Sequence, residues 1–358
     1  MSIQVKIKKS FGTFALDVCF EAGDETVGLL GASGCGKSMT LKCIAGIVRP
    51  DEGKIVVNGR TLFDSERHID LSPQKRRVGL LFQNYALFPN MTVEQNILSV
   101  LSRKERKGAR KRLASLVERF YLTGLERRYP AQLSGGQQQR AAVARIMAAD
   151  PSILMLDEPL SALDSYLRWQ LEGEIMQILD DFRGTALCVS HNRDEVYRLC
   201  RKVCTMSQGR NEEVRTIGEL FKSPNTLASS LLSGCKNYSR ITRLDERRIR
   251  AMDWNVDLRC GADIAEDACY VGVRSHCVEP DTTETGGDGG ENSFPCRVLR
   301  VIDDVFSTII NLCPLNAPSS RDFSRIRMEL PKREAEAIRA GDVVRVKIKP
   351  HDLMLLKK

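Results

Sequence analysis

The part of this sequence best suited to chemistry is a glycine-rich run, Gly31-Ala32-Ser33-Gly34-Cys35-Gly36-Lys37-Ser38. Its pattern, G-x-x-x-x-G-K-S, lets the backbone curl so that successive N–H groups point at phosphate oxygens. An apolar stretch at residues 26–30 precedes the run, and apolar residues at helical spacing follow it. A strand should therefore lead into this loop and a helix should leave it. We expect the run and the adjacent Met39 to bind a nucleotide, with Lys37 on the β- and γ-phosphates and Ser38 on Mg²⁺.

Two adjacent carboxylates, Asp157 and Glu158, follow the apolar run at residues 153–156. We expect Asp157 to hold Mg²⁺, directly or through water, and Glu158 to activate the water that attacks the γ-phosphate. Neighbouring acids are usually surface residues. Their place at the end of an apolar strand, in a chain that has a phosphate loop, favours the catalytic interpretation.

Gln83 and His191 follow two more apolar runs, at residues 78–82 and 185–189. In open α/β sheets, ligands gather at the carboxyl ends of the parallel strands. We therefore predict that both side chains reach the γ-phosphate and act in catalysis, and that Gln83 joins Ser38 and Asp157 around Mg²⁺. A single Gln or His is ordinarily a satisfied polar residue, so this prediction depends on their shared place at strand ends.

The elements that must position these residues change in character along the chain. Up to residue 232, short apolar runs alternate with helix-length segments, which predicts a parallel sheet flanked by helices. From 233 to 358, residues 325–330 and 344–348 alternate apolar with polar side chains, as half-buried antiparallel strands do. We predict an α/β domain followed by a small β-rich domain, which a flexible glycine-rich connection at 282–293 divides into two halves.

The two halves of the β-rich domain share a short pattern. Residues 271–278 and 346–353 both read V-x-(V/I)-(R/K)-x-H-x-(V/L). Eight positions are a weak signal, and we state as a hypothesis that two similar small β-units pack together, with these segments in equivalent places.

Composition narrows the choice of function. The chain has 358 residues, of which 42% are hydrophobic, enough for two domains with their own cores. No run approaches the roughly 18 apolar residues of a membrane-spanning helix, so we expect a cytoplasmic protein. Its 12 cysteines form no CxxC pair and no metal cluster, which indicates reduced thiols. Despite a net charge of +8, the basic run at 103–112 lacks aromatic residues that could stack on bases, so we expect no nucleic acid partner.

Leu133-Ser134-Gly135-Gly136-Gln137 resembles the signature of ABC ATPases, and the other motifs of residues 1–232 follow in that family's order. Gln83 matches the Q-loop glutamine, Ser161-Ala162-Leu163-Asp164 resembles the D-loop, and His191 matches the switch histidine. The resemblance implies a P-loop NTPase cassette with a helical signature subdomain at about 84–150, using ATP and Mg²⁺.

The resemblance also implies how the site is completed. In this family, the signature of one subunit closes over ATP bound to the phosphate loop of another. Ser134, Gly135, Gly136, Gln137 and Asp164 would then contact nucleotide, and a single set of motifs implies a homodimer. An aromatic residue near the start stacks on adenine in the family, which Phe11 fits best, with Phe14 as a rival and core packing as the alternative for both.

Residues 76–89 resemble the Q-loop region of importer ATPases, which receives a helix of a separate permease. We expect Tyr85, Leu87 and Phe88 to form that groove, unless they pack within the domain. The resemblance implies a peripheral protein at the cytoplasmic face of the membrane, working with a permease and, indirectly, with an extracytoplasmic solute-binding protein.

The second domain is similar to a TOBE-type domain, and the whole chain looks most like molybdate or sulfate/molybdate import ATPases. Residues 234–240 offer Lys, Asn, Ser and Arg for molybdate or another oxyanion, although a purely structural domain has equal weight. Sulfate, ferric iron, polyamines and sugars are the alternative solutes.

Two other classes of function compete with transport. A soluble ABC protein of DNA repair or translation generally has two cassettes or a long coiled-coil insertion, and this sequence has neither. A degenerate cassette that binds ATP without hydrolysing it would lack catalytic groups, whereas Lys37, Asp157, Glu158 and His191 are all present.

Overall fold

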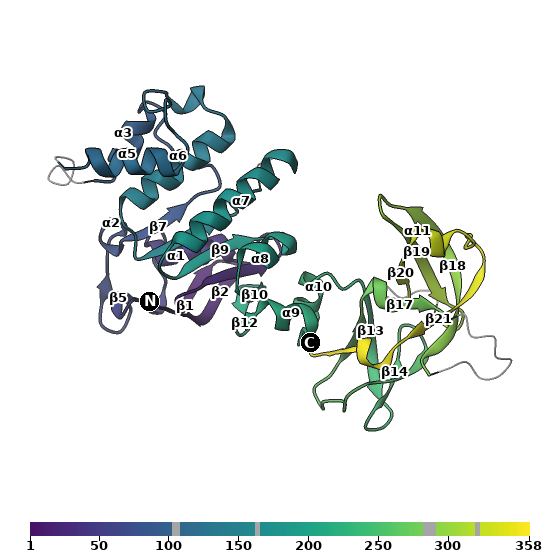
Figure 1. Ribbon diagram of the computed structural model, residues 1–358. Helices are drawn as coiled ribbons and strands as arrows, with labels where there is room; N and C mark the ends of the chain where they lie inside the picture. The colour runs from purple at the N-terminus through teal and green to yellow at the C-terminus, as the bar shows by residue number, and fades with distance from the viewer. Residues whose placement is uncertain (102–107, 162–164, 282–290, 319–322) are drawn as a thin grey trace. The chain divides into compact units, whose positions relative to one another are not determined.

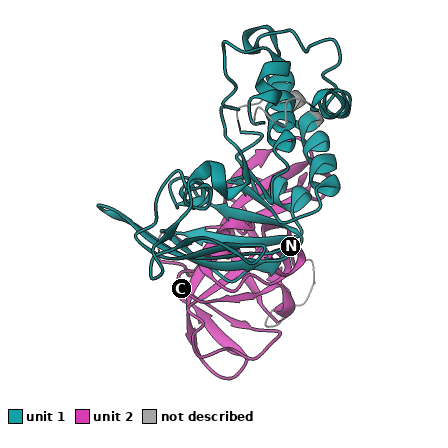
Figure 2. Ribbon diagram, turned by 90° about the vertical axis from the view of Figure 1, so that its left-hand side faces the viewer, with its two compact units in different colours: residues 1–217 teal, residues 218–358 magenta. Residues whose placement is uncertain are grey.

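The computed structural model describes residues 1–101, 108–161, 165–281, 291–318 and 323–358 (Figure 1). Contacts divide the chain into two compact units, Met1–Ile217 and Gly218–Lys358, which Figure 2 colours separately. No helix within the described residues is both long and apolar enough to cross a membrane.

Unit 1 is built on one sheet with strand order β6-β5-β4-β1-β2-β11-β10-β3-β9-β8-β7, and β12 also pairs with β10. Its strands are β1 Ile3–Phe11, β2 Phe14–Ala22, β3 Thr26–Gly31, β4 Glu52–Val57, β5 Arg60–Asp64, β6 Ile69–Asp70, β7 Val78–Leu81, β8 Ile153–Asp157, β9 Ala186–Ser190, β10 Lys202–Ser207, β11 Arg210–Asn211 and β12 Arg215–Thr216.

Five neighbouring strands, β10, β3, β9, β8 and β7, are parallel. Four of them confirm the apolar runs that the sequence marked as strands, with ends that differ by a residue. Nearly every residue of β3, β8 and β9 is buried, because helices cover both faces of a parallel sheet. Their carboxyl ends therefore meet at one edge.

The antiparallel part of this sheet was not predicted. In β1 and β2, buried and exposed residues alternate, as expected for a hairpin with one face on the core. The registers pair Ile3 with Ala22 and Phe11 with Phe14. The alternation is visible in the sequence as Ile3, Val5 and Ile7 between polar residues, so this signal was available.

The helices of unit 1 flank the sheet or form a separate group, and Figure 1 draws α3, α5 and α6 together. Among the described residues they are α1 Lys37–Ala45, α2 Pro73–Arg76, α3 Val93–Leu98, α5 Arg110–Arg119, α6 Gly135–Ala148, α7 Ser165–Asp181 and α8 Arg193–Leu199, with a 3₁₀ turn at Pro130–Gln132. Of the basic run at 103–112, residues 103–107 lie outside the described part, and Arg110, Lys111 and Arg112 are exposed on α5.

Unit 2 contains two five-stranded sheets of order β15-β14-β13-β16-β22 and β17-β21-β18-β19-β20. The elements are β13 Asn237–Arg243, β14 Arg248–Ala251, β15 Val256–Arg259, β16 Tyr270–Val273, β17 Val278–Pro280, β18 Ser293–Asp303, β19 Ser307–Pro314, β20 Ile326–Pro331, β21 Val343–Ile348 and β22 Met354–Leu356, with α9 Ile217–Lys222, which begins at the boundary, α10 Leu227–Leu232 and α11 Lys332–Ala335. The predicted strands at 325–330 and 344–348 are confirmed as β20 and β21.

The repeat hypothesis is confirmed by the strand pairing. The first segment covers the end of β16, a 3₁₀ turn at Ser275–Cys277 and the start of β17, and the second covers the end of β21 and a 3₁₀ turn at Pro350–Asp352 and leads into β22. β16 pairs with β22 and β17 pairs with β21, both antiparallel. Each segment thus crosses from one sheet to the other, and the last strand of each half completes the sheet of the other half.

A pair of asparagines repeats the same two-fold relation. Asn237 pairs with Val273 at the end of β16, donates to the carbonyl of Arg327 at 2.9 Å and accepts from its N–H at 2.7 Å. Asn292 accepts the N–H of Arg259 at 2.7 Å and donates to its carbonyl at 2.9 Å. Each asparagine therefore fixes a strand of the opposite half.

The boundary between the units differs from the predicted one. The sequence placed it between residues 232 and 233, whereas the contacts place it after Ile217, so that α10 lies in unit 2. A reason is local: α10 packs on β16, and Leu227 donates its N–H to the carbonyl of Lys357. Most of the predicted connection at 282–293 lies outside the described residues, which resume at Glu291.

Candidate nucleotide-binding site

The glycine-rich run forms a tight loop between β3 and α1, as predicted. Gly34 and Gly36 have φ angles of 81° and 109°, which are strained for residues with a side chain. A Cβ on Gly36 would also lie 2.6 Å from Leu16. The loop thus needs glycine at both positions, and it ends at the N-terminus of α1, where free N–H groups and the helix dipole favour an anion.

Lys37 lies folded over this loop. Its Nζ donates to the carbonyl oxygens of Gly31 and Ala32 at 2.8 and 3.0 Å, and the residue is 4% exposed. These carbonyls, with the Cys35 sulfur 4.0 Å away, give the buried ammonium no full counter-charge. Phosphate oxygens entering the loop would supply that charge.

Ser38 and Asp157 meet directly, although they are far apart in the sequence. The Ser38 hydroxyl donates to Asp157 Oδ1 at 2.7 Å. Asp157 is 7% exposed, and burial raises the pKa of its carboxyl, while the Ser38 hydrogen bond acts in the opposite direction. Two adjacent hard oxygen ligands fit Mg²⁺, which takes one or two protein oxygens and completes its shell with phosphate and water.

Glu158 and His191 face each other across the ends of β8 and β9. His191 Nδ1 lies 3.2 Å from Glu158 Oε1, and His191 is exposed. Glu158 has a φ of 47°, a left-handed backbone that non-glycine residues adopt at a cost. This conformation marks the point where the chain leaves β8, and the Glu158 side chain is 19% exposed beside His191.

Gln83 reaches the same edge from β7 through an intermediary. Its Nε2 donates to the Ser161 hydroxyl at 3.2 Å, and this hydroxyl donates to the carbonyl of Glu158 at 3.0 Å. Gln83 is exposed. The structure therefore brings Gln83 to Glu158 through Ser161 and gives it no direct bond to Ser38 or Asp157, the other predicted Mg²⁺ ligands.

The signature residues occupy the start of α6. Ser134 is the N-cap: its hydroxyl accepts the N–H of Gln137 at 3.3 Å, and Gln137 Oε1 accepts the N–H of Ser134 at 3.0 Å. Ser134 is exposed. Among the described residues, no hydrogen bond or ion pair joins the signature to the phosphate loop of the same chain. Asp164, also predicted to contact nucleotide, lies outside the described residues.

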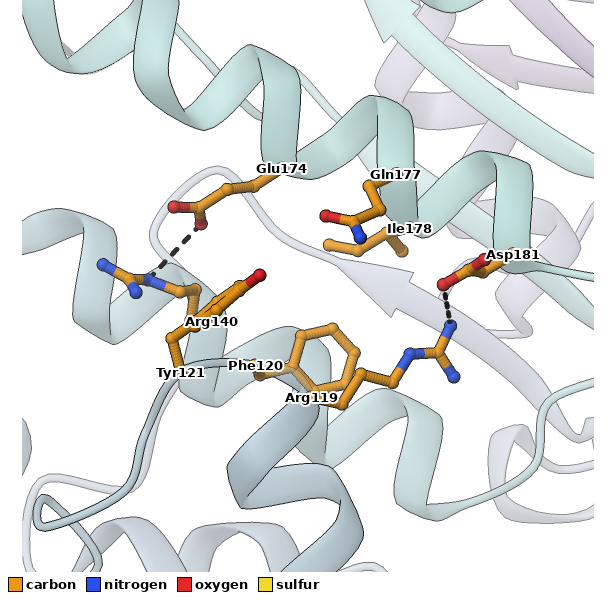
Figure 3. A pocket seen from close by; sticks show the side chains of 8 residues that line it. All are labelled: Arg119, Phe120, Tyr121, Arg140, Glu174, Gln177, Ile178 and Asp181. Atoms are coloured by element: carbon orange, nitrogen blue, oxygen red, sulfur yellow. Dashed lines mark hydrogen bonds and ion pairs between the residues drawn. The ribbon is translucent and has the colours of Figure 1, made fainter.

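Figure 3 shows how α6 and the adjoining end of α5 meet α7 around a cavity of about 30 Å³. Arg140 on α6 pairs with Glu174 on α7 at 3.3 Å, and Arg119 on α5 pairs with Asp181 at 3.0 Å. Burial raises the pKa of Glu174, and Arg140 lowers it. The first pair joins the signature helix to α7, the helix that follows Glu158 along the chain, and the second joins α5 to the same helix.

Gly136 of the signature makes a second contact with α7. A Cβ there would lie 3.3 Å from a methyl carbon of Leu171, so the small residue lets the two helices approach. Sequence reasoning assigned Gly136 only to nucleotide contact. It also missed the Arg140–Glu174 pair, because Arg140 follows three glutamines and no sequence pattern marks its partner on α7.

A groove of about 440 Å³ opens on unit 1 away from these contacts, lined mainly by apolar residues. Phe88, predicted to face a permease, lines it and is 46% exposed, as is Ile47 at 49%. Tyr85 is 9% exposed and packs within the domain, which was the alternative interpretation. Neither it nor Leu87 belongs to the lining residues.

The two candidates for adenine stacking lie together. The rings of Phe11 and Phe14 are 6.3 Å apart and both residues are half-buried. Lys9 lies over the Phe11 ring at 5.8 Å. Phe14 is nearer the phosphate loop, with a ring atom 3.2 Å from the Cβ position of Gly36. This contact gives Phe14 a packing role.

The anion candidate in unit 2 is largely occupied by internal bonds. Arg240 pairs with the fully buried Asp253 at 2.7 Å, and Ser239 accepts the N–H of Asp253 at 2.9 Å. Asn237 is committed to Arg327. Of the four polar side chains proposed for an oxyanion, Lys236 alone is exposed without a role in these bonds, so the contacts favour a structural function for this segment.

Comparison with known proteins agrees with this geometry. A family model described as ABC transporter matches residues 15–161. A sulfate/thiosulfate import ATP-binding protein of Synechocystis sp. is 39% identical over 230 residues, covering 63% of this chain and 63% of that protein. Another, of Rhizobium meliloti, is 38% identical over 289 residues, covering 78% of this chain and 77% of that protein.

A solved ATP-binding cassette, dimeric in a post-hydrolysis state with ADP and Pi, is 26% identical, covering 61% of this chain and 99% of its own, with a TM-score of 0.49. The match to the Rhizobium meliloti protein is longer than unit 1, so it extends into unit 2. The chain therefore belongs to the ABC transporter family, whose ATP-binding cassette it carries ahead of a β-rich domain.

Proposed function

We propose that this chain hydrolyses ATP as a homodimer and thereby powers a membrane importer for an inorganic oxyanion, with sulfate or thiosulfate as the solute. One observation supports it above all. The Ser38–Asp157 and Glu158–His191 pairs lie beside each other at the edge where the phosphate loop opens. That arrangement provides metal ligands, a base and phosphate contacts within one site.

In this proposal, the N–H groups of the loop and the N-terminus of α1 bind the phosphates of ATP. Lys37 leaves the carbonyls of Gly31 and Ala32 and donates to the β- and γ-phosphates. Ser38 and Asp157 hold Mg²⁺, which when bound neutralises charge that builds on the transferred phosphoryl group.

Glu158 would accept a proton from the water that attacks the γ-phosphate. His191, 3.2 Å from that carboxylate, orients it and can donate to phosphate oxygen. Gln83 is linked to Glu158 through Ser161. A change at the catalytic site would therefore shift Gln83 and, with it, the neighbouring groove.

The place of the signature supports the homodimer. Ser134 is exposed at the start of α6 and is not bonded to its own phosphate loop. A second copy could place its Ser134 and Gly136 against the γ-phosphate, so that ATP closes the pair and hydrolysis reopens it.

The permease would dock in the groove lined by Phe88, Ile47 and Leu80. Exposed apolar residues around a concave surface are what an amphipathic helix of a partner recognises. A permease partner would place this chain at the cytoplasmic face of a membrane.

The choice of sulfate or thiosulfate as the solute is supported by the names of the similar proteins, which specify import of these two anions. The sequence had favoured molybdate, which these names do not support. The internal bonds of Asn237, Ser239 and Arg240 also weaken the idea of an oxyanion site in unit 2.

ATP turnover by the purified full chain tests the enzymatic part. Glu158→Gln should lower turnover by roughly 10²-fold or more, the usual contribution of a general base, while ATP still binds. With Mg-ATP this variant should also shift from monomer to dimer in light scattering. Undiminished turnover would refute the role of Glu158.

Uptake of labelled solutes tests the transport part. Cells carrying the wild-type chain should import radiolabelled sulfate or thiosulfate, and cells carrying Glu158→Gln should not. If molybdate uptake alone responds to the substitution, molybdate is the solute. If no oxyanion responds, the importer assignment requires another solute.

A further inference from the structure

Arg145, in the last turn of α6, connects the signature helix to the groove. It is 9% exposed, and burial lowers its pKa. Its two terminal nitrogens donate to the carbonyls of Ala86 at 2.7 Å and Tyr85 at 3.1 Å. Its guanidinium also lies over the Phe88 ring at 5.6 Å. One side chain thus contacts three residues of segment 83–88.

The carbonyls that Arg145 binds belong to an unusual backbone. Tyr85 and Ala86 have φ angles of 59° and 46°, so two successive non-glycine residues are left-handed. Such a conformation is costly and persists only where surrounding contacts impose it. The fork of the guanidinium fits this task because it can bind two carbonyls at once from a fixed plane.

The rest of segment 83–88 is anchored elsewhere. Gln83 bonds Ser161 near Glu158. At the other end, the N–H and carbonyl of Phe88 bond the Asn96 side chain on α3 at 2.8 and 3.1 Å. Arg145 therefore holds the middle of a segment that links the catalytic edge to the groove.

Among the described residues, no carboxylate forms an ion pair with Arg145. Its charge is directed at the carbonyls and at the Phe88 ring. A largely buried cation of this kind loses stabilisation when it leaves its partners, because at 9% exposure little water can replace them. If α6 moves, the carbonyls of residues 85 and 86 must move with it or lose their donor.

The opposite end of α6 carries the signature. The helix has 14 residues and spans about 21 Å. After Gly136 it contains neither glycine nor proline, so it can move as a rigid rod. A displacement of Ser134 and Gly136 toward a nucleotide would therefore displace Arg145.

We propose that Arg145 is a positioning residue that transmits the position of the signature helix to segment 83–88, so that the groove changes shape with the nucleotide state. This rests on the proposed ATP-driven closure of two copies. The partner that reads the change is the permease segment seated beside Phe88.

Hydrogen exchange of the full chain tests this without an identified permease. The background is Glu158→Gln, compared with and without saturating Mg-ATP. Exchange should change at the start of α6 and in segment 83–88 together. Adding Arg145→Met should keep the change at α6 and remove it from segment 83–88. There, exchange without nucleotide should rise about tenfold, because the backbone of residues 85 and 86 opens more readily once its carbonyls lose their donor.

Two further variants make the test specific. Arg145→Lys keeps the charge but not the two-pronged donor, so it should restore the response only in part. Arg112→Met is the matched control: Arg112 on α5 donates to the carbonyl of Met147 at the same end of α6, at 3.3 Å and outside the groove, and its loss should leave both responses unchanged. ATP affinity, measured in each variant, verifies that the cassette is folded.

The outcomes separate this inference from the proposed function. A nucleotide response of segment 83–88 that persists in the Arg145→Met variant would overturn the role of Arg145 alone. No response at the start of α6 in the background protein would contradict ATP-driven closure, and the inference would fall with it.

Discussion

At the scale of single residues, the site combines groups that are costly to keep without nucleotide. Lys37 is buried on neutral carbonyls, Asp157 is a buried carboxylate and Glu158 has a left-handed backbone. These groups lower the stability of the protein without nucleotide, and they favour the binding of a ligand that supplies the missing charges. Substitutions of Asp157 and Lys37 test these two effects separately.

Asp157→Asn should stabilise the chain when nucleotide is absent. Because burial raises the pKa of this carboxyl in the folded state, the wild type loses stability as pH rises through that pKa. The variant should thus unfold at a higher temperature near pH 7, with the difference shrinking as the pH falls toward the range where aspartate protonates. Thermal unfolding at several pH values measures it, and a lower melting temperature at pH 7 would contradict the role of burial.

Lys37→Ala should weaken ATP binding by about tenfold to a hundredfold, since a hydrogen bond to a charged group contributes about 1.5–3 kcal/mol. Calorimetry of the nucleotide-binding step gives the affinity directly. Lys6, which is exposed on β1, provides a control as Lys6→Ala. Equal affinities for the two variants would count against the assignment of Lys37.

At the scale of elements, the packing of α6 on α7 sets where the signature lies. Of the two ion pairs in Figure 3, Arg140–Glu174 is the more enclosed, with both side chains 19% exposed, against 38% and 54% for Arg119–Asp181. Exposed pairs contribute about 0–1 kcal/mol, whereas removing one partner of an enclosed pair strands the other charge.

Arg140→Met should therefore destabilise the chain more than Arg119→Met does. The loss should grow as pH rises, because Glu174, whose pKa burial already raises, then carries a charge without its partner. Urea unfolding at acidic and alkaline pH compares the variants. A pH-independent loss would show that Arg140 acts by packing alone.

How far the sequence predicted these elements depended on the kind of signal. The strands β3, β7, β8 and β9 were predicted because each is a compact apolar run before a polar residue, and the clustering of Gly31, Asp157 and His191 followed from their parallel order. The contacts of Arg145 and Arg140 could not be predicted, because their partners are brought near only by the packing of α6. Gln83 lies at the carboxyl edge of the sheet, as its place after an apolar run predicted. Its hydrogen bond to Ser161 could not be predicted, because it depends on the conformation of a loop.

At the scale of the whole molecule, unit 2 is held together by contacts between its halves. Asn237→Ala and Asn292→Ala should each cost about 1–3 kcal/mol, since each leaves a buried backbone donor and acceptor without partners. Asn237 is fully buried and Asn292 is 8% exposed, so the first loss should be the larger.

Tryptophan fluorescence can follow this prediction in the full chain. Of its two tryptophans, Trp254 is fully buried in unit 2 and donates to the carbonyl of Phe323, whereas Trp169 is 77% exposed. The change in emission on urea unfolding therefore reports mainly on unit 2. Equal midpoints for wild type and both variants would refute the idea that the asparagines join the halves.

The exchange of final strands in unit 2 has a consequence for how such a domain could have arisen. β17 completes the sheet of the second half and β22 that of the first, so one half by itself would have a strand projecting with no sheet to join. Two identical copies of such a half would satisfy each other as an intertwined homodimer. Joining two copies end to end turns that dimer into a single chain. The sequences of the two halves can then diverge, while each half still needs the last strand of the other to complete its sheet.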